Sequence, residues 1–127
     1  MLTIFLLLLL FQVKHFICDY PLQTQYMLGK MQAIGWIKPL AAHAAVHAWF
    51  TFLILLLLQP SNVLLYLLLP LADFVLHFIV DRIKASPNLG GRFTPTQPYF
   101  WWALGADQMA HHLINYVFIF IIVIYGN

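Results

Sequence analysis

Every acidic side chain of this sequence has a histidine one helical turn away. The chain contains 4 acidic residues, all of them Asp, and 6 His. The pairs spaced by four residues are His15–Asp19, Asp73–His77, His77–Asp81, Asp107–His111 and the two-imidazole pair His43–His47. Residues four apart lie on the same face of a helix. Imidazole and carboxylate groups presented in this way are ligands that a divalent metal takes from one helix face.

The pairs together predict a metal centre. The candidate metal ligands are His15, Asp19, His43, His47, His77, Asp81, Asp107 and His111. Eight ligands are many for one ion and suit two, so we expect a divalent transition metal, with two ions of zinc, manganese or iron. Proteins of the four-helix di-iron class build sites from inward side chains on facing helices in this manner.

Two carboxylates are candidate catalytic groups. Asp81 shares a helix face with His77 and lies next to Arg82, so we expect it to bridge the metals or act as a base. Asp73 is the second candidate, either catalytic itself or orienting His77 from outside the metal ligands. His112 has no acidic residue four positions away, and we do not include it among the ligands.

The composition places these groups in a membrane protein. The chain has 127 residues, of which 63% are hydrophobic and 8% are charged, whereas soluble domains carry about 25% charged residues. Soluble globular and disordered classes are therefore excluded. A net charge of +2 is too small for a nucleic-acid-binding protein. The single cysteine, Cys18, excludes an internal disulfide framework, and we expect its side chain to be buried.

Four apolar segments predict an all-α, polytopic membrane protein that folds as one four-helix transmembrane bundle. Crossing a bilayer takes about 20 apolar residues, and the expected spans cover residues 2–19, 40–58, 63–81 and 99–125 of one domain. Between the first two spans, residues 22–37 are expected to form a short interfacial helix that starts near Pro21. Residues 85–98 contain several Pro and Gly and predict a loop.

Basic residues set the expected orientation. Five of the 6 basic residues lie in two alternate loops, 20–39 and 82–98, and none lies in the other connections or at the termini. By the positive-inside rule both loops are cytoplasmic and both termini are outside. All eight candidate ligands then fall in the cytoplasmic half of the membrane. Lys14, the sixth basic residue, is expected to extend to the cytoplasmic surface.

The ordered motifs also resemble a known family. The series is His15-x3-Asp19-Tyr-Pro-Leu-Gln, His43-x3-His47, His77-x3-Asp81-x2-Lys84 and Asp107-Gln-x2-His111. It is similar to a domain-of-unknown-function family of small integral membrane proteins from bacteria and their phages. The resemblance implies a bacterial inner (cytoplasmic) membrane protein. A looser, architectural likeness is to membrane-bound metal-dependent hydrolases.

These features favour a membrane-embedded, metal-dependent hydrolase that acts on a lipid or lipid-linked substrate near the cytoplasmic interface. We expect membrane lipid as its partner, with homo-oligomer formation left open. No Ser, Cys or Thr nucleophile accompanies the His–Asp pairs, so direct attack by metal-bound water is the simpler mechanism. The basic and polar residues on the same side are candidates for substrate binding: Lys30, Arg82, Lys84 and Gln23.

Two other functional classes remain open. One is a di-iron-type membrane oxidoreductase that acts on acyl chains, with which the abundance of His is compatible. The other is a non-enzymatic bacterial or phage membrane protein that transports metal or protons, or binds a host partner. A transport role is weakened because the polar residues stop halfway across the membrane, whereas a conduit needs them on both sides.

Overall fold

The fold is all-α, as predicted. The computed structural model describes residues 1–126. Its four long helices are α1 (Leu2–Asp19), α2 (Ile37–Leu58), α3 (Leu65–Ala85) and α4 (Pro98–Tyr125), and two short 3-10 helices are η1 (Met27–Met31) and η2 (Gly90–Arg92). The long helices match the four expected segments to within a few residues. Helix α2 starts earlier than expected because Pro39 lies in its first turn, where its missing N–H leaves no hydrogen bond unmade.

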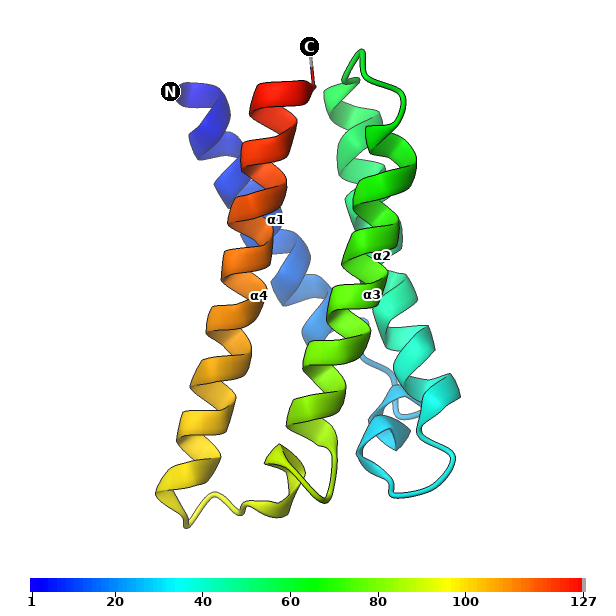
Figure 1. Cartoon of the computed structure of the whole chain (residues 1–127), viewed down its shortest axis with the longest axis vertical. Helices are drawn as coiled ribbons and strands as arrows, with labels where there is room; N and C mark the ends of the chain where they lie inside the picture. Colours follow the sequence, from blue (N-terminus) through cyan, green and yellow to red (C-terminus); the bar gives the residue numbers. More distant parts are fainter. Residues whose placement is uncertain (127) are drawn as a thin grey trace.

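The four helices run alternately up and down (Figure 1). Both termini and the turn between α2 and α3 lie at one end of the bundle, and the segments that contain η1 and η2 lie at the other. At the first end, the backbone N–H of Ser61 donates to the carbonyl of Gly126 at 2.8 Å, which ties the turn to the end of α4. We call the two ends the terminal end and the basic-loop end. The two loops that carry basic residues are therefore on the same end of the molecule.

Three of the helices, α1, α2 and α4, are long and apolar enough to cross a membrane. Helix α3 is of similar length, but it contains four charged residues, namely Asp73, Asp81, Arg82 and Lys84. It packs most extensively against α2 and also contacts α4, so its polar face is covered by the other helices.

The segment between α1 and α2 is not the interfacial helix expected over residues 22–37. Only Met27–Met31 form a short 3-10 helix, and residues 22–26 before it and 32–36 after it form turns, bends and irregular chain. Two glycines explain the difference, since glycine disfavours helix. Gly29 packs so closely that a Cβ there would lie 2.9 Å from Cγ of Pro39, and Gly35 has a φ of +77°.

The buried interior changes character along the helices. In the half near the terminal end, the core is apolar and consists of Leu7, Phe11, Ile54, Leu55, Leu65, Leu69, Phe118, Ile119 and Ile122. In the half near the basic-loop end, the buried side chains are mostly ionisable. We call these the apolar half and the polar half. Cys18 is fully buried, as predicted.

Candidate metal centre

All eight predicted ligands face the interior of the polar half. Each long helix contributes two of them: His15 and Asp19 from α1, His43 and His47 from α2, His77 and Asp81 from α3, and Asp107 and His111 from α4. Seven are buried residues, and the Asp19 side chain is 17% exposed. The one-turn spacing places each pair on one helix face, and on each helix that face is turned toward the other helices.

The carboxylate of Asp19 contacts imidazole rings from two helices. Its Oδ2 lies 3.1 Å from Nε2 of His15 on the same helix. Its Oδ1 lies 3.0 Å from Nε2 of His47 and 3.4 Å from Nε2 of His43, both on α2. The ligand atoms of Asp19, His43 and His47 are all within 4.8 Å of one another, a spacing at which one metal ion can contact all three.

Asp81 is the centre of a second group. Its Oδ1 lies 3.0 Å from Nε2 of His111, which in turn lies 3.4 Å from Oδ1 of Asp107. The ligand atoms of these three residues also lie within 4.8 Å of one another. Oδ2 of Asp81 is 2.9 Å from Nε2 of His43, the residue that also contacts Asp19. The two groups are thus joined through one imidazole.

A third group consists of imidazoles alone, from three helices. His15, His47 and His77 bring their ligand nitrogens within 4.8 Å of one another. The His77 ring is stacked between two others, with centroids 3.8 Å from His47 and 4.3 Å from His111. His47 belongs both to this group and to the Asp19 group, so the three groups form one continuous cluster of nitrogen and oxygen ligands.

Several buried ring nitrogens of this cluster have no hydrogen-bond partner among residues 1–126. They include Nδ1 of His15, His47 and His111, and Nε2 of His77. Buried polar atoms in proteins are nearly always paired, so nitrogens left bare in this way indicate a missing partner. A set of imidazoles and carboxylates without thiolates suits zinc, manganese or iron. The residues therefore fit the metal that the sequence predicts.

Asp73 lies behind His77 rather than in any of the three groups. Its Oδ1 is 2.8 Å from Nδ1 of His77, and its backbone carbonyl lies 3.1 Å from the same nitrogen as a hydrogen-bond partner. Nε2 of His77 is thus the nitrogen available to a metal. Its Oδ2 accepts hydrogen bonds from the hydroxyl of Thr51 at 2.6 Å and from the ammonium of Lys14. A carboxylate that holds the outer nitrogen of a histidine is common in metal sites, where it fixes the ring and its tautomer.

The expectation for Lys14 was wrong. Its side chain does not extend to the cytoplasmic surface but is buried, at 2% exposure, and forms an ion pair with Asp73. The cost of removing two charges from water or lipid headgroups explains the pairing, because a buried carboxylate with no cation is far more costly than a paired one.

One hydroxyl that the sequence analysis did not single out lies beside the His–Asp pairs. Thr51 is fully buried and lies one turn after His47 on the same stripe of α2. Its hydroxyl proton is donated to Asp73, so the group holds that carboxylate in place. The spacing of four from His47 was a signal available in the sequence. Lys14 had no such signal, since its partner lies 59 residues away.

The predicted substrate-binding residues fall into two kinds. Lys30 from η1 lies 2.9 Å from Oδ2 of Asp81, and Lys84 from α3 lies 2.9 Å from Oδ2 of Asp107. Both ammonium groups therefore contact carboxylates of the Asp81 group. Gln23 lines a cavity of about 290 Å³ together with these two lysines.

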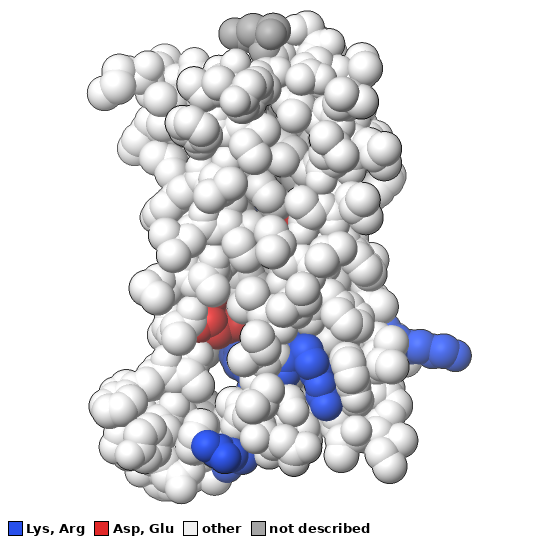
Figure 2. All heavy atoms as spheres, in the orientation of Figure 1, with Lys and Arg blue, Asp and Glu red and all other residues white. Residues whose placement is uncertain are grey.

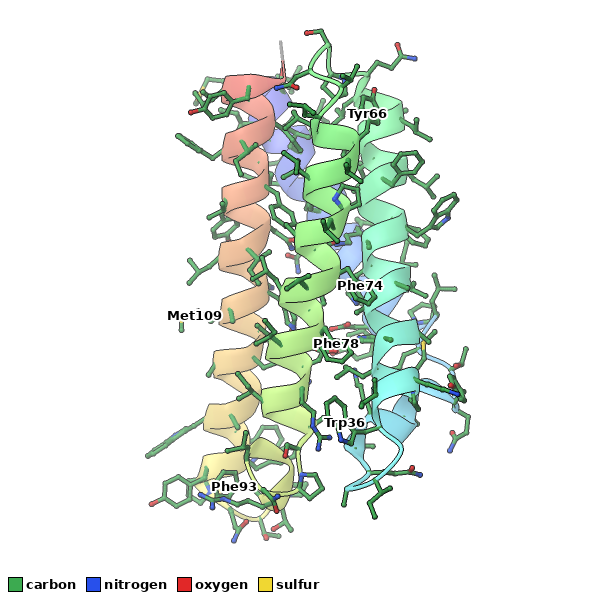
Figure 3. The ribbon with its side chains drawn as sticks, turned by 45° about the vertical axis from the view of Figure 1, so that its right-hand side comes forward. Trp36, Tyr66, Phe74, Phe78, Phe93 and Met109 are labelled. Carbon is green, nitrogen blue, oxygen red and sulfur yellow. The ribbon has the colours of Figure 1, made fainter. Side chains whose placement is uncertain are left out.

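Arg82, by contrast, is engaged in holding the η1 segment. It donates to the backbone carbonyls of Lys30 at 3.1 Å and Gln32 at 3.3 Å. Its guanidinium also lies 3.8 Å from the ring centre of Trp36, which is labelled at the basic-loop end in Figure 3. These contacts position Lys30 against Asp81.

Polar residues beside the cluster link the helices. The Gln108 side chain on α4 lies 3.3 Å from Nε2 of His15 on α1 and donates to Asp107 at 3.1 Å. His112 is only partly buried, its ring centre is 6.0 Å from that of His15, and it belongs to none of the three ligand groups.

A four-helix protein with a buried His and Asp cluster, and with helices able to cross a membrane, is the class that the fold and the site define. Within that class, the chain belongs to the family described as protein of unknown function DUF3307, whose family model matches residues 4–127. The family resemblance noted in the sequence is thereby confirmed. Neither a comparison with curated proteins nor one with solved structures yields a match.

Proposed function

We propose that this protein is a membrane-embedded, metal-dependent hydrolase of a lipid or lipid-linked substrate. The observation that carries the proposal is the convergence of eight His and Asp side chains from four helices into one buried cluster with three possible metal positions. Ionisable groups inside a membrane cost about 2.5–3.5 kcal/mol each on insertion scales. Retaining so many at one depth needs a functional reason, and metal binding provides one.

Two divalent ions held here would supply a water nucleophile at neutral pH and stabilise charge at a phosphoryl or acyl centre. The chain's own part is to hold and orient. Asp81 has one oxygen toward His111 and the other toward His43 and Lys30, so it is the carboxylate best positioned to accept a proton or to bridge. Asp73 fixes the ring of His77.

The orientation in the membrane is part of the proposal. Figure 2 shows the Lys and Arg side chains on this face gathered in the half of the molecule away from the terminal end. The positive-inside rule then favours a cytoplasmic basic-loop end, with both termini outside. A reporter that is active only in the cytoplasm, fused to the C-terminus, should give no signal. A strong signal there would reverse the orientation and move the site to the outer leaflet.

The activity is tested by incubating purified protein with total bacterial membrane lipid and added metal. We expect release of a water-soluble headgroup or a free acid. Asp81→Ala should abolish turnover, and Lys84→Ala should raise the substrate concentration needed while metal stays bound. His112→Ala is the matched control and should keep both metal and turnover. Absence of any lipid change in protein that firmly binds metal would contradict the proposal.

One observation favours a second candidate, a di-iron-type oxidoreductase acting on acyl chains. The all-imidazole group of His15, His47 and His77 is a nitrogen-rich site of the kind that suits iron. The same lipid incubation separates the two functions. New double bonds or hydroxyl groups in the acyl chains would support the oxidoreductase, whereas cleaved headgroups or acyl esters would support the hydrolase.

A further inference from the structure

Two cavities adjoin at the basic-loop end, where α3 faces α4. One has a volume of about 440 Å³ and is lined mainly by apolar side chains, including Val80, Ile83, Ala106 and Ala110. The other is the cavity of about 290 Å³ that Gln23, Lys30 and Lys84 line. Ligand sites in proteins typically measure about 300–1,000 Å³, so the pair is large enough for a small amphipathic molecule.

The two cavities share part of their walls. Lys84, Gly90, Phe93 and Ala103 line both. Gly90 allows this arrangement, because a Cβ there would lie 2.6 Å from the backbone oxygen of Lys84. The loop after α3 can therefore fold back over the end of that helix. This brings Phe93 to the basic-loop end (Figure 3).

Three polar residues that line the two cavities belong to the candidate metal centre or contact it. Asp107 lines the larger cavity and belongs to the Asp81 group of ligands. Lys84 pairs with Asp107 and Lys30 pairs with Asp81. Since the ligand atoms of Asp81 and Asp107 lie within 4.8 Å of each other, both ammonium groups border the same metal position. The Lys84 side chain is 38% exposed, so it also reaches the surface.

We propose that these cavities bind one phospholipid with an anionic headgroup. Its phosphate lies against Lys30 and Lys84, and one acyl chain lies in the larger, apolar cavity between α3 and α4, which we call the groove. The inference rests on the proposed function and deepens it by naming the substrate class. The apolar cavity lies beside α4, a helix able to cross a membrane. In a bilayer, the acyl chains of the surrounding lipids would therefore lie next to this cavity. Charge complementarity selects the headgroup, because Arg92 lies at the same cavity as Lys84.

Metal binding strengthens the argument for an anion. Lys30 and Lys84 each contact Oδ2 of a carboxylate, on Asp81 and Asp107, whose Oδ1 faces His111 in the same candidate group of metal ligands. Once a divalent ion neutralises Asp81 and Asp107, the two lysines have no other ion-pair partner among residues 1–126, and a phosphate group is the natural replacement. The phosphate then lies beside the metal position, where a hydrolase needs it.

Photo-crosslinking tests the site without relying on turnover. The full-length protein is reconstituted in phosphatidylcholine vesicles that contain a minor amount of phosphatidic acid carrying a diazirine in one acyl chain. We expect adducts concentrated in residues 80–93 and 103–110. A phosphatidylcholine probe with the same diazirine chain should label these residues several-fold less, and Lys84→Gln should remove that difference.

Two matched substitutions on α4 give the control. Ala106→Phe fills the groove and should lower labelling by phosphatidic acid several-fold. Met109→Phe adds the same ring where the side chain is 61% exposed and points away from the bundle (Figure 3), and it should leave labelling unchanged. Equal labelling of the two variants, or adducts spread evenly over all exposed helix faces, would overturn the proposal.

A second copy of the chain is the alternative occupant of the groove. Wild-type protein that forms dimers, loses them on Ala106→Phe and shows no groove labelling would overturn the lipid proposal. The outcome for the hydrolase is separate. Headgroup-selective labelling in protein that neither binds metal nor cleaves lipid supports the lipid site and contradicts only the enzyme. Lipid cleavage that Ala106→Phe leaves unchanged supports the enzyme and contradicts the groove.

Discussion

The apolar and polar halves of this bundle use the same four buried helix faces with opposite chemistry. On α1 the buried stripe runs from Leu7 and Phe11 to Lys14 and His15. On the other helices it changes in the same way, between Leu55 and Thr51 on α2, Leu69 and Asp73 on α3, and Phe118 and Asn115 on α4. The change falls at one level of the bundle, which divides it into two regions with separate tasks.

The division into an apolar and a polar half indicates how one small chain can keep many ionisable side chains buried, although burying them is energetically unfavourable. Packing between helices in a membrane depends on close van der Waals contact and on polar groups between helices. The apolar half supplies the first, for example where Phe11 and Phe118 meet edge to face at 6.4 Å. The polar half can then contain imidazole nitrogens that have no hydrogen-bond partner in the protein and are available to a ligand. The core residues of the apolar half include no ionisable side chain.

The largest expected effect comes from breaking the ion pair at the boundary of the two halves. Lys14→Met leaves the fully buried carboxylate of Asp73 without its cation, which should cost about 3–5 kcal/mol of folding free energy. Unfolding in mixed micelles with a denaturing detergent measures the loss. The double variant Lys14→Met/Asp73→Asn removes both charges and should recover most of the stability. A single variant as stable as the wild type would show that the pair is not formed.

A cavity in the apolar half should lower stability but not metal content. Leu55 is fully buried, so Leu55→Ala should cost about 2–5 kcal/mol. Leu57→Ala on the same helix, where the side chain is 70% exposed, should change stability by less than about 0.5 kcal/mol. Metal analysis of folded protein should give the same content for both. Loss of metal from folded Leu55→Ala would contradict the division into two tasks.

The smallest of these effects sharpens the boundary itself. The charge-free double variant Lys14→Met/Asp73→Asn should fold, yet its His77 no longer faces a carboxylate. Loss of such a partner typically lowers metal affinity by about 10–100-fold. Competition with a chelator measures the affinity. Thr51→Val keeps the carboxylate and loses only one hydrogen bond to it, so it should change the affinity less. Equal metal affinities in the wild type and the double variant would show that Asp73 does not support metal binding.

Much of the fold followed from the sequence because long apolar runs leave few alternatives to helices. Apolar runs separated by Pro- and Gly-containing loops specify helices, and the one-turn His–Asp spacing specifies which faces meet. The eight candidate ligands lie close together, as those spacings predicted. The start of α2 and the short η1 were missed, since local packing of Gly29 on Pro39 overrides the composition of that segment.

The pairing inside the site could not be predicted in the same way. A spacing of four relates residues on one helix, whereas the contacts of Lys14 with Asp73 and of Lys30 with Asp81 join residues more than 50 positions apart. Such contacts depend on how the helices are rotated against one another. Arg82 illustrates the same limit, because its neighbours in space are the carbonyls of η1 and the ring of Trp36.

Metal analysis of the purified protein tests the central claim most directly. Protein prepared without chelators should contain about two equivalents of a transition metal, as expected for a two-metal hydrolytic site. Asp107→Ala should lower that number, and His112→Ala, outside the ligand groups, should not. Wild-type protein that is stable, fully active and free of metal would contradict the account.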